Sequence, residues 1–240
     1  MSARPSVSLC VIARDEAARI QRCLASAREV VDEIVVVDTG SVDDTAALAE
    51  AAGARVFHCP WCDDFAAARN AALDRATGEW ILRLDADEEL LPESVPLVRE
   101  VTARDDVLAA YVYGQQVESE SQTGGFIEMR HLRLWRDHPR VRYVGRIHEH
   151  FGNALEGLAE ETQRAVVDTG IRIRHWGYLP AARGDKLRRA VRLLEMELED
   201  RPDQLYYEIE LGRTWCLLGD PRGSALLERA LRRVLETPNA

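Results

Sequence analysis

Two aspartates, Asp85 and Asp87, follow an apolar segment and stand two residues apart. On an extended chain, residues two apart point to the same side, so both carboxylates can face one ligand. Hard divalent cations prefer oxygen ligands and commonly join one or two carboxylates to substrate phosphates. One carboxylate can therefore meet a ribose and the other a metal ion. The alternative is a solvated acidic turn, because a short motif of this kind often occurs without a function.

Three further side chains are candidates for a ligand site. Asp38 ends a run of valines, where its carboxylate can accept hydrogen bonds from a base or ribose, or cap the next helix. Arg69 can contact a base or a phosphate through its fork of donors, or form a surface ion pair. A neutral His175 can be an additional Mn²⁺ ligand, or it can pack against Trp176.

The first ninety residues alternate between strand and helix patterns. We predict strands at Val7–Ala13, Glu33–Asp38, Arg55–His58 and Glu79–Asp85. Helices are predicted at 17–27 and at 65–76. A further helix is predicted to begin at Ser41, where the sequence resembles a capping box. This alternation is typical of an α/β fold with a mostly parallel sheet, in which ligands bind beyond the carboxyl ends of the strands. The polar residues that follow these strands should therefore meet at one edge.

The second half of the chain follows another pattern. Strands are predicted at 109–116 and 126–135, joined by a polar loop at 118–125, and another at 171–175. They suggest an antiparallel extension of the sheet that carries acceptor-side loops. From Asp185 the apolar residues recur at helical spacing. We therefore expect a main domain at 1–180 and a small helical tail at 181–240.

Composition narrows the class of protein. The chain has 240 residues and a net charge of -10, which disfavours a general nucleic-acid binder. We expect a cytoplasmic protein, since no apolar run reaches the roughly 20 residues that span a bilayer, and the N-terminus lacks the apolar core of a signal peptide. The five cysteines fit reduced, mostly buried thiols. Cys59-Pro60-Trp61-Cys62 looks like a thioredoxin motif, but the surrounding elements do not match one.

Four motifs occur in a fixed order in the first ninety residues. They are R-D-E at 14–16, V-V-V-D-T-G-S-x-D-D-T at 35–45, D-D-F-x-x-A-R-N at 63–70 and G-E-W-I-L-R-L-D-A-D-E at 78–88. Over about residues 6–90 this order resembles the family-2 glycosyltransferases of the GT-A fold. The resemblance is closest to a bacterial subgroup with Gly-x-Ile-His-Glu, here 145–149, a later His, here His175, and a tetratricopeptide-like helical tail.

The resemblance implies inverting transfer of a sugar from a nucleoside-diphosphate sugar, most often a UDP-sugar, with Mn²⁺ or Mg²⁺. The acceptor could be a peptide, a glycan or a small molecule. By the same analogy, the nucleotide end is lined by Ile12, Ala13 and Glu16, the base is contacted by Asp38 and Arg69, the ribose by Asp85, and the metal by Asp87 and His175. Asp15 departs from the Asn usual in the family, which adds a charge near the diphosphate.

Glu149 and His148 are the candidate catalytic bases, because an inverting displacement needs a group that takes the proton of the acceptor. The alternative for Glu149 is a salt bridge with Arg142 or Arg146.

Other functions stay open at this point. A nucleotidyltransferase would need a glycine-rich loop near the N-terminus, which is missing. A non-enzymatic nucleotide-sugar-binding interaction protein would use the tail to dock a partner, but the intact Asp85, Asp87 and Glu88 argue against such decay. The tail could also pack on the sheet domain or form a homodimer.

Overall fold

The computed structural model describes residues 4–117, 126–176 and 183–236, and it divides into two compact units. The first unit comprises 1–62, 66–144 and 150–179. The second comprises 63–65, 145–149 and 180–240, so two short segments from earlier in the chain join the helical region. The predicted loop at 118–125 lies outside the described residues.

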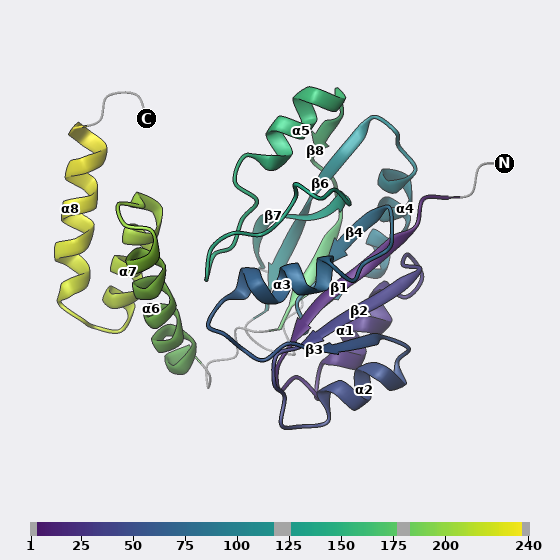
Figure 1. The fold of residues 1–240 in the computed structure, drawn as a ribbon, viewed down its shortest axis with the longest axis horizontal. Helices are drawn as coiled ribbons and strands as arrows, with labels where there is room; N and C mark the ends of the chain where they lie inside the picture. The colour runs from purple at the N-terminus through teal and green to yellow at the C-terminus, as the bar shows by residue number, and fades with distance from the viewer. Residues whose placement is uncertain (1–3, 118–125, 177–182, 237–240) are drawn as a thin grey trace. The chain divides into compact units, whose positions relative to one another are not determined.

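The first unit is built on one mixed sheet with the strand order β3-β2-β1-β4-β7-β6-β9-β5, in which β8 pairs with β6 (Figure 1). Its parallel half consists of β1 (Val7–Ala13), β2 (Glu33–Asp38), β3 (Arg55–His58) and β4 (Trp80–Arg83). The predicted α/β class and these four strands are confirmed, although β4 ends two residues before Asp85. The acidic residues therefore lie in a turn and not on the strand.

The other half of the sheet is not purely antiparallel, as the sequence suggested. β6 (Val107–Gln116) and β7 (Ile127–Arg136) form the expected antiparallel pair, and β7 also joins β4. β8 (Ala165–Val167) and β9 (Arg172–His175) instead run parallel to β6. A short strand that the sequence did not predict, β5 (Glu88–Leu90), pairs antiparallel with β9.

Helices cover both faces of this sheet. One face carries α1 (Ile20–Ala27), α2 (Thr45–Ala51) and α4 (Val95–Thr102), preceded by the 3₁₀ turn η1 (Pro92–Ser94). The other carries α3 (Phe65–Leu73) and α5 (Ala154–Thr162). Alternate residues of β1 enter the two cores, since Leu9 and Val11 pack with α1 whereas Cys10 packs with α3.

The predicted start of a helix at Ser41 is wrong, because α2 begins at Thr45. The polar side chains before it hold a loop. The Ser41 hydroxyl binds Asp38, and the Asp43 carboxylate accepts a hydrogen bond from the backbone N–H of Thr45. Ser41 and Asp43 thus stabilise the connection between β2 and α2, and Ser41 does not begin the helix.

The helical region of the second unit comprises α6 (Arg183–Asp200), α7 (Leu205–Leu217) and α8 (Arg222–Glu236). Its small core contains Leu194, Tyr207, Leu211 and Leu226. α7 and α8 approach closely at two glycines, since a Cβ at Gly212 would lie 2.8 Å from the Leu227 Cγ and one at Gly223 would lie 2.6 Å from the Gly212 carbonyl oxygen. Within the described part of the chain, no helix is long and apolar enough to cross a bilayer.

Gly212→Ala should destabilise the helical unit by about 1–3 kcal/mol, because the added methyl group overpacks the α7–α8 contact. Gly157→Ala in α5 is the matched control. A Cβ there meets nothing within 4 Å, so the change should be stabilising by up to about 1 kcal/mol through helix propensity. Urea unfolding of both variants measures the difference, and equal stabilities would show that the close approach is misplaced.

Candidate functional site

The loops that follow β1 and β2 are joined by hydrogen bonds. The backbone N–H of Asp15 donates to the Ser41 hydroxyl at 3.0 Å, and the Asp15 carboxylate accepts from the N–H of Val42 at 2.8 Å. The N–H of Glu16 donates to the Thr45 hydroxyl at 2.8 Å. Asp15 also has φ of 54°, a conformation that Asp and Asn tolerate better than most residues. The carboxylate that departs from the family pattern therefore fixes this pair of loops.

Asp38 lies buried at the carboxyl end of β2, opposite Ala13 of β1. Its carboxylate accepts hydrogen bonds from the backbone N–H and the hydroxyl of Ser41, and it lies 3.2 Å from the Nδ1 of His58. Burial alone raises the pKa of Asp38, but these hydrogen bonds outweigh it, so the pKa lies below its usual value. Asp38 is an anion that organises its own loop, and it does not cap α2.

Three guanidinium groups surround the carboxylate of Asp85. Arg69 of α3 approaches to 2.8 Å, Arg83 of β4 to 3.1 Å and Arg133 of β7 to 3.3 Å. Burial raises the pKa of Asp85, yet the three cations outweigh burial and hold the pKa well below its ordinary value. Their field extends further: burial together with Arg133 and Arg83 lowers the pKa of His131 to about 4, so this imidazole is neutral.

Glu88 completes the acidic turn from inside the protein. Its carboxylate accepts from the backbone N–H of Asp85 at 2.8 Å and pairs with Arg133 at 2.7 Å. The Glu88 side chain is buried, and burial raises its pKa although Arg133 opposes the shift. From α1, the thiol of Cys23 donates to the carbonyl oxygen of Asp85 at 3.3 Å. The turn that bears the two aspartates is thus held from several elements.

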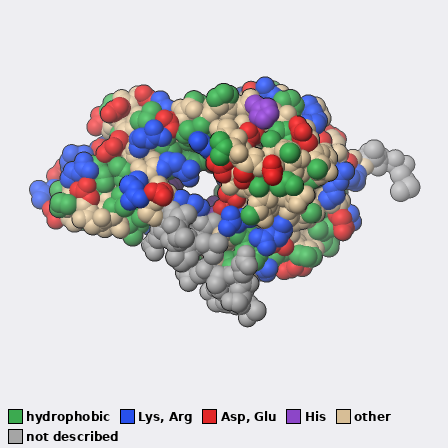
Figure 2. Space-filling view, turned by 90° about the horizontal axis from the view of Figure 1, so that it is seen from below, with side chains coloured by type: hydrophobic (Ala, Val, Ile, Leu, Met, Phe, Trp, Pro, Cys, Tyr) green, Lys and Arg blue, Asp and Glu red, His purple; other side chains and the backbone are tan. Residues whose placement is uncertain are grey.

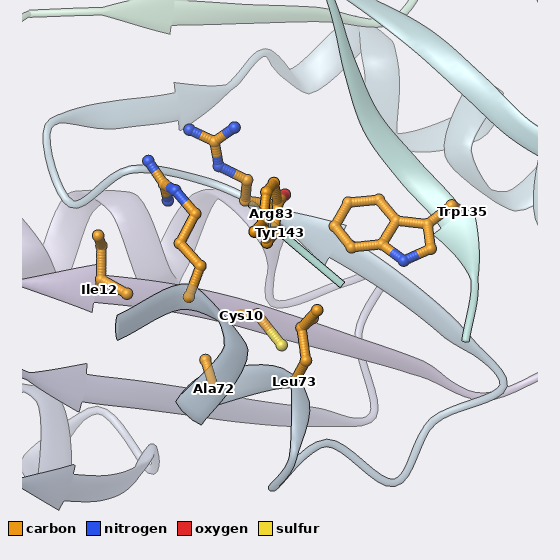
Figure 3. A pocket seen from close by; sticks show the side chains of 8 residues that line it. Cys10, Ile12, Ala72, Leu73, Arg83, Trp135 and Tyr143 are labelled. Carbon is orange, nitrogen blue, oxygen red and sulfur yellow. The ribbon is translucent and has the colours of Figure 1, made fainter. Parts of the chain in front are cut away.

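A small pocket lies beside this cluster (Figure 3). The lining residues are Cys10, Ile12, Arg69, Ala72, Leu73, Arg83, Trp135 and Tyr143. The Tyr143 ring lies edge-on to Trp135 and within 6 Å of both the Arg69 and the Arg83 guanidinium groups. Asn70 holds the Tyr143 backbone by two hydrogen bonds of 2.8 and 2.9 Å. The adjacent Arg69 and Asn70 therefore have separate roles: Arg69 pairs with the Asp85 carboxylate, and Asn70 positions Tyr143.

Asp87 and His175 come together through strand pairing. β5 and β9 place Glu88 opposite His175, and the N–H of Trp176 donates to the Asp87 carbonyl oxygen at 2.9 Å. The His175 Nε2 then lies 3.3 Å from an Asp87 carboxylate oxygen. Burial lowers the pKa of His175, but Asp87 outweighs it and leaves the pKa raised. Trp176 itself hydrogen-bonds Glu89 and lies under the Arg22 guanidinium at 4.2 Å.

The Asp87–His175 pair can serve as part of a divalent-cation site. Among the described residues, no group of three or more His, Cys, Asp or Glu side chains gathers in a metal-binding arrangement. A carboxylate nevertheless fits Mn²⁺ or Mg²⁺, which complete their coordination with water and substrate phosphates, and a neutral imidazole can be an additional ligand of Mn²⁺. Binding would replace the proton that the raised pKa of His175 favours.

The two candidate bases belong to the second unit, whereas the donor-side residues belong to the first. His148 has φ of 53°, and its Nε2 lies 3.9 Å from a Glu210 carboxylate oxygen of α7. Burial lowers the pKa of His148, and Glu210 and Glu149 oppose this shift. His148 is therefore a neutral imidazole near pH 7, which can accept a proton.

The remaining predicted residues lie as follows. Ile12 lines the pocket, Ala13 is buried next to Asp38, and the Glu16 carboxylate lies 3.3 Å from Arg19.

All five cysteines are free. The prediction that they are mostly buried is wrong, since only Cys10 and Cys23 are buried and Cys62 and Cys216 are exposed. A short loop before α3 leaves Cys62 at the surface.

Sequence reasoning missed Arg83 and Arg133. Arg83 stands two residues before Asp85 and Arg133 two before the buried Trp135. Alternation places Arg133 on the same side of β7 as Trp135, and the short spacing from Arg83 to Asp85 is compatible with an ion pair; these were the available signals. Arg83 finds its partner Asp85 close by in sequence, whereas Arg133 meets Asp85 and Glu88 only in the folded sheet.

Comparison with known proteins connects this site to a family. Residues 8–156 match the model of glycosyl transferase family 2. The chain belongs to glycosyl transferase family 2. A TPR repeat-containing protein of Synechococcus elongatus is 39% identical over 91% of this chain and 54% of its own length. The glycosyltransferase SunS of Bacillus subtilis is 29% identical over 89% and 50%. The chain thus spans about half the length of these curated relatives.

Solved structures share the fold of this chain. Glucosyl-3-phosphoglycerate synthase from Mycobacterium tuberculosis, in complex with Mn²⁺, UDP and glucosyl-3-phosphoglycerate, superimposes with a TM-score of 0.54 at 18% identity, over 83% of this chain and 82% of that one. Residues 1–349 of S. aureus TarS give 0.51 at 13% identity, over 87% and 70%. The predicted GT-A architecture is therefore confirmed, together with a helical C-terminal region.

Arg133→Met should destabilise the protein by about 3–5 kcal/mol, because it removes one partner of a buried ion cluster and leaves Glu88 without its cation. Arg130→Met on the same strand is the control. Arg130 is 54% exposed and pairs with Asp168 at the surface, so its loss should cost less than about 1 kcal/mol. Urea unfolding compares the two, and a small effect at Arg133 would contradict the structural role of the cluster.

Proposed function

We propose that this protein is a glycosyltransferase that moves a sugar from a UDP-sugar to an acceptor nucleophile, with inversion and with the help of a divalent cation. The observation that carries the proposal is the Asp87–His175 pair. Asp87 lies in the turn after β4 of a family-2 domain, near the charge-neutralised Asp85, and His175 ends β9. The neighbour that was solved with Mn²⁺ and UDP supports this ligand class.

Asp87 and His175 would hold the cation. A divalent cation bound there supplies neutralisation of the charge that develops on the departing diphosphate. The protein's own part is to fix these two side chains, which the β5–β9 pairing does through the backbone bond from Trp176. Glu88 and Arg133 prevent the turn from moving, because both are buried and bonded to it.

The nucleotide would bind at the joined loops after β1 and β2. Ile12, Ala13 and Glu16 line this end, Asp38 contacts the base, and Asp85 supports the ribose. Arg69 pairs with Asp85, and a guanidinium of this kind suits a base or a phosphate because its donors form a planar fork. This assignment makes Asp38 and Arg69 affinity residues, since such contacts are shared by ground and transition states.

Asp87→Asn should abolish most UDP release from UDP-sugars and the Mn²⁺-dependent part of the thermal shift with UDP. A ligand that binds only the native state raises the melting temperature, so the shift reports binding directly. Asp106→Asn is the control, because Asp106 is exposed and pairs only with the surface residue Arg104 in the described contacts. Wild-type turnover in Asp87→Asn would remove the metal assignment.

The same assay addresses the alternative function. A nucleotide-sugar-binding interaction protein would show the Mn²⁺-dependent shift with UDP but release no UDP from any UDP-sugar. A nucleotidyltransferase would instead release pyrophosphate from a nucleoside triphosphate.

We assign the general base to Glu149, with His148 as the competing residue. Loss of a general base typically lowers the rate by about 10²–10⁴-fold. Glu149→Gln should therefore keep the UDP and Mn²⁺ thermal shift but lose acceptor-stimulated UDP release, measured with a panel of peptides, glycans and small alcohols. If His148→Ala is inactive and Glu149→Gln is active, the base is His148. Normal activity of both variants would place the base outside this segment.

A further inference from the structure

The Gly145–Glu149 segment belongs to the second unit together with the helical region. Arg146 joins the segment to α6 through its backbone and its side chain. Its backbone N–H donates to the Glu197 carboxylate of α6 at 2.7 Å, and its guanidinium forms a two-point pair with Asp200 at 2.7 and 2.6 Å. Backbone and side chain of one residue are thus held by two acids one turn apart on the same helix.

Glu197 is a buried acid, and its burial costs hydration free energy. Its side chain is 1% exposed, and Arg201 pairs with it one helical turn later. A carboxylate is stable in such a place only when charges and hydrogen bonds compensate for lost hydration. One of the compensating bonds comes from the segment itself, through the Arg146 N–H. A helix that only stabilised its own bundle would be served better by an apolar side chain at this position.

Two neighbours of Arg146 also contact the helices. Ile147 packs against the core formed by Leu194, Tyr207, Leu211 and Leu226. Gly145 has φ of 102°, and a Cβ there would lie 2.4 Å from the Tyr207 hydroxyl. Glycine is therefore needed for both the backbone conformation and the close approach. The segment is fitted to α7 as well as to α6.

The helices hold a second motif segment in the same way. Arg192 of α6 binds the Asp63 carboxylate, with one contact of 3.0 Å. The Arg146 guanidinium donates to the Asp63 carbonyl oxygen, and the N–H of Phe65 donates to the Arg146 carbonyl oxygen at 2.9 Å. The start of D-D-F-x-x-A-R-N is thereby fixed to G-R-I-H-E.

We propose that α6 and α7 are a positioning scaffold for the acceptor-side segment, and that Glu197 and Arg146 are positioning residues for His148 and Glu149. The proposal rests on the function proposed above, in which one of these two residues is the base. It gives the helical region a role in the reaction itself, in place of a role as an independent docking module. A misplacement of about 1 Å can cost roughly 10²-fold in rate, so such a scaffold can control turnover.

The test compares Glu197→Ala with Glu197→Gln in the full chain. Hydrogen exchange of the peptide 143–151 should rise in Glu197→Ala, because the Arg146 N–H loses its acceptor, and should change little in Glu197→Gln, whose amide oxygen can still accept. The kcat for UDP release with the acceptor panel should fall roughly 10–100-fold in Glu197→Ala. The thermal shift with UDP and Mn²⁺ should stay unchanged.

The imidazole of His148 provides an independent readout. Glu210, Glu149 and Arg213 are the charged groups that act on it, and burial keeps its pKa below the usual value. Release of the segment removes that burial, so an NMR titration of Glu197→Ala should show the His148 pKa raised above that of the wild type. A role of Glu197 in bundle stability alone would lower the melting temperature without moving this pKa.

The double variant Asp185→Asn, Arg188→Ala is the control, since it removes an exposed ion pair of the same helix. It should leave the hydrogen exchange of the peptide 143–151, the His148 pKa and kcat unchanged.

If Glu197→Ala does not fold, Arg146→Ala tests the attachment of the same segment through its contacts with Asp200 and Asp63. Wild-type exchange and His148 pKa in the folded variants, or unchanged kcat despite faster exchange, would overturn the proposal. A wild-type protein that releases no UDP from any UDP-sugar would instead remove the proposed function, and the exchange and titration results would still decide whether the helices hold the segment.

Discussion

The carboxylate of Asp85 lies among three guanidinium groups, and the architecture of the first unit depends on this contact. Its partners come from three elements, α3, β4 and β7, and the arginine of β7 is 48 residues from Asp85 in sequence. Burying several charges together costs hydration energy that only close pairing restores. The cluster is therefore stable only when all of these elements are in place, which couples the acidic turn to the folding of the sheet.

The same cluster gives Asp85 and Asp87, which look alike in the sequence, different partners. Asp85 is committed to arginines, and Glu88 is committed to Arg133 and to the backbone of the turn. Asp87 instead pairs with His175. A turn fixed by its buried neighbours can present one carboxylate in a defined position, which a cation site requires because ligand distances to metals tolerate little variation.

The mixed surface charge disfavours a binder of polyanions. On the face shown in Figure 2, acidic and basic side chains are mixed. Basic groups also lie inside the first unit, on α3, β4 and β7, where they are paired with carboxylates.

The sequence by itself determined the parallel half of the sheet, the family resemblance and the identity of the acidic turn. These follow from local information: β-branched runs, helical periodicity and motifs that are contiguous in the chain. It also identified His175 as a candidate, although its pairing with Asp87 depends on β5, a three-residue strand too short to predict. The tertiary structure alone decided the role of Arg133, because its partners Asp85 and Glu88 are 48 and 45 residues away in sequence. It likewise decided that G-R-I-H-E belongs with the helical region, since Glu197 and Asp200 are about fifty residues away in sequence. Contacts between distant segments carry no periodic signal along the chain, and so only the folded structure shows them.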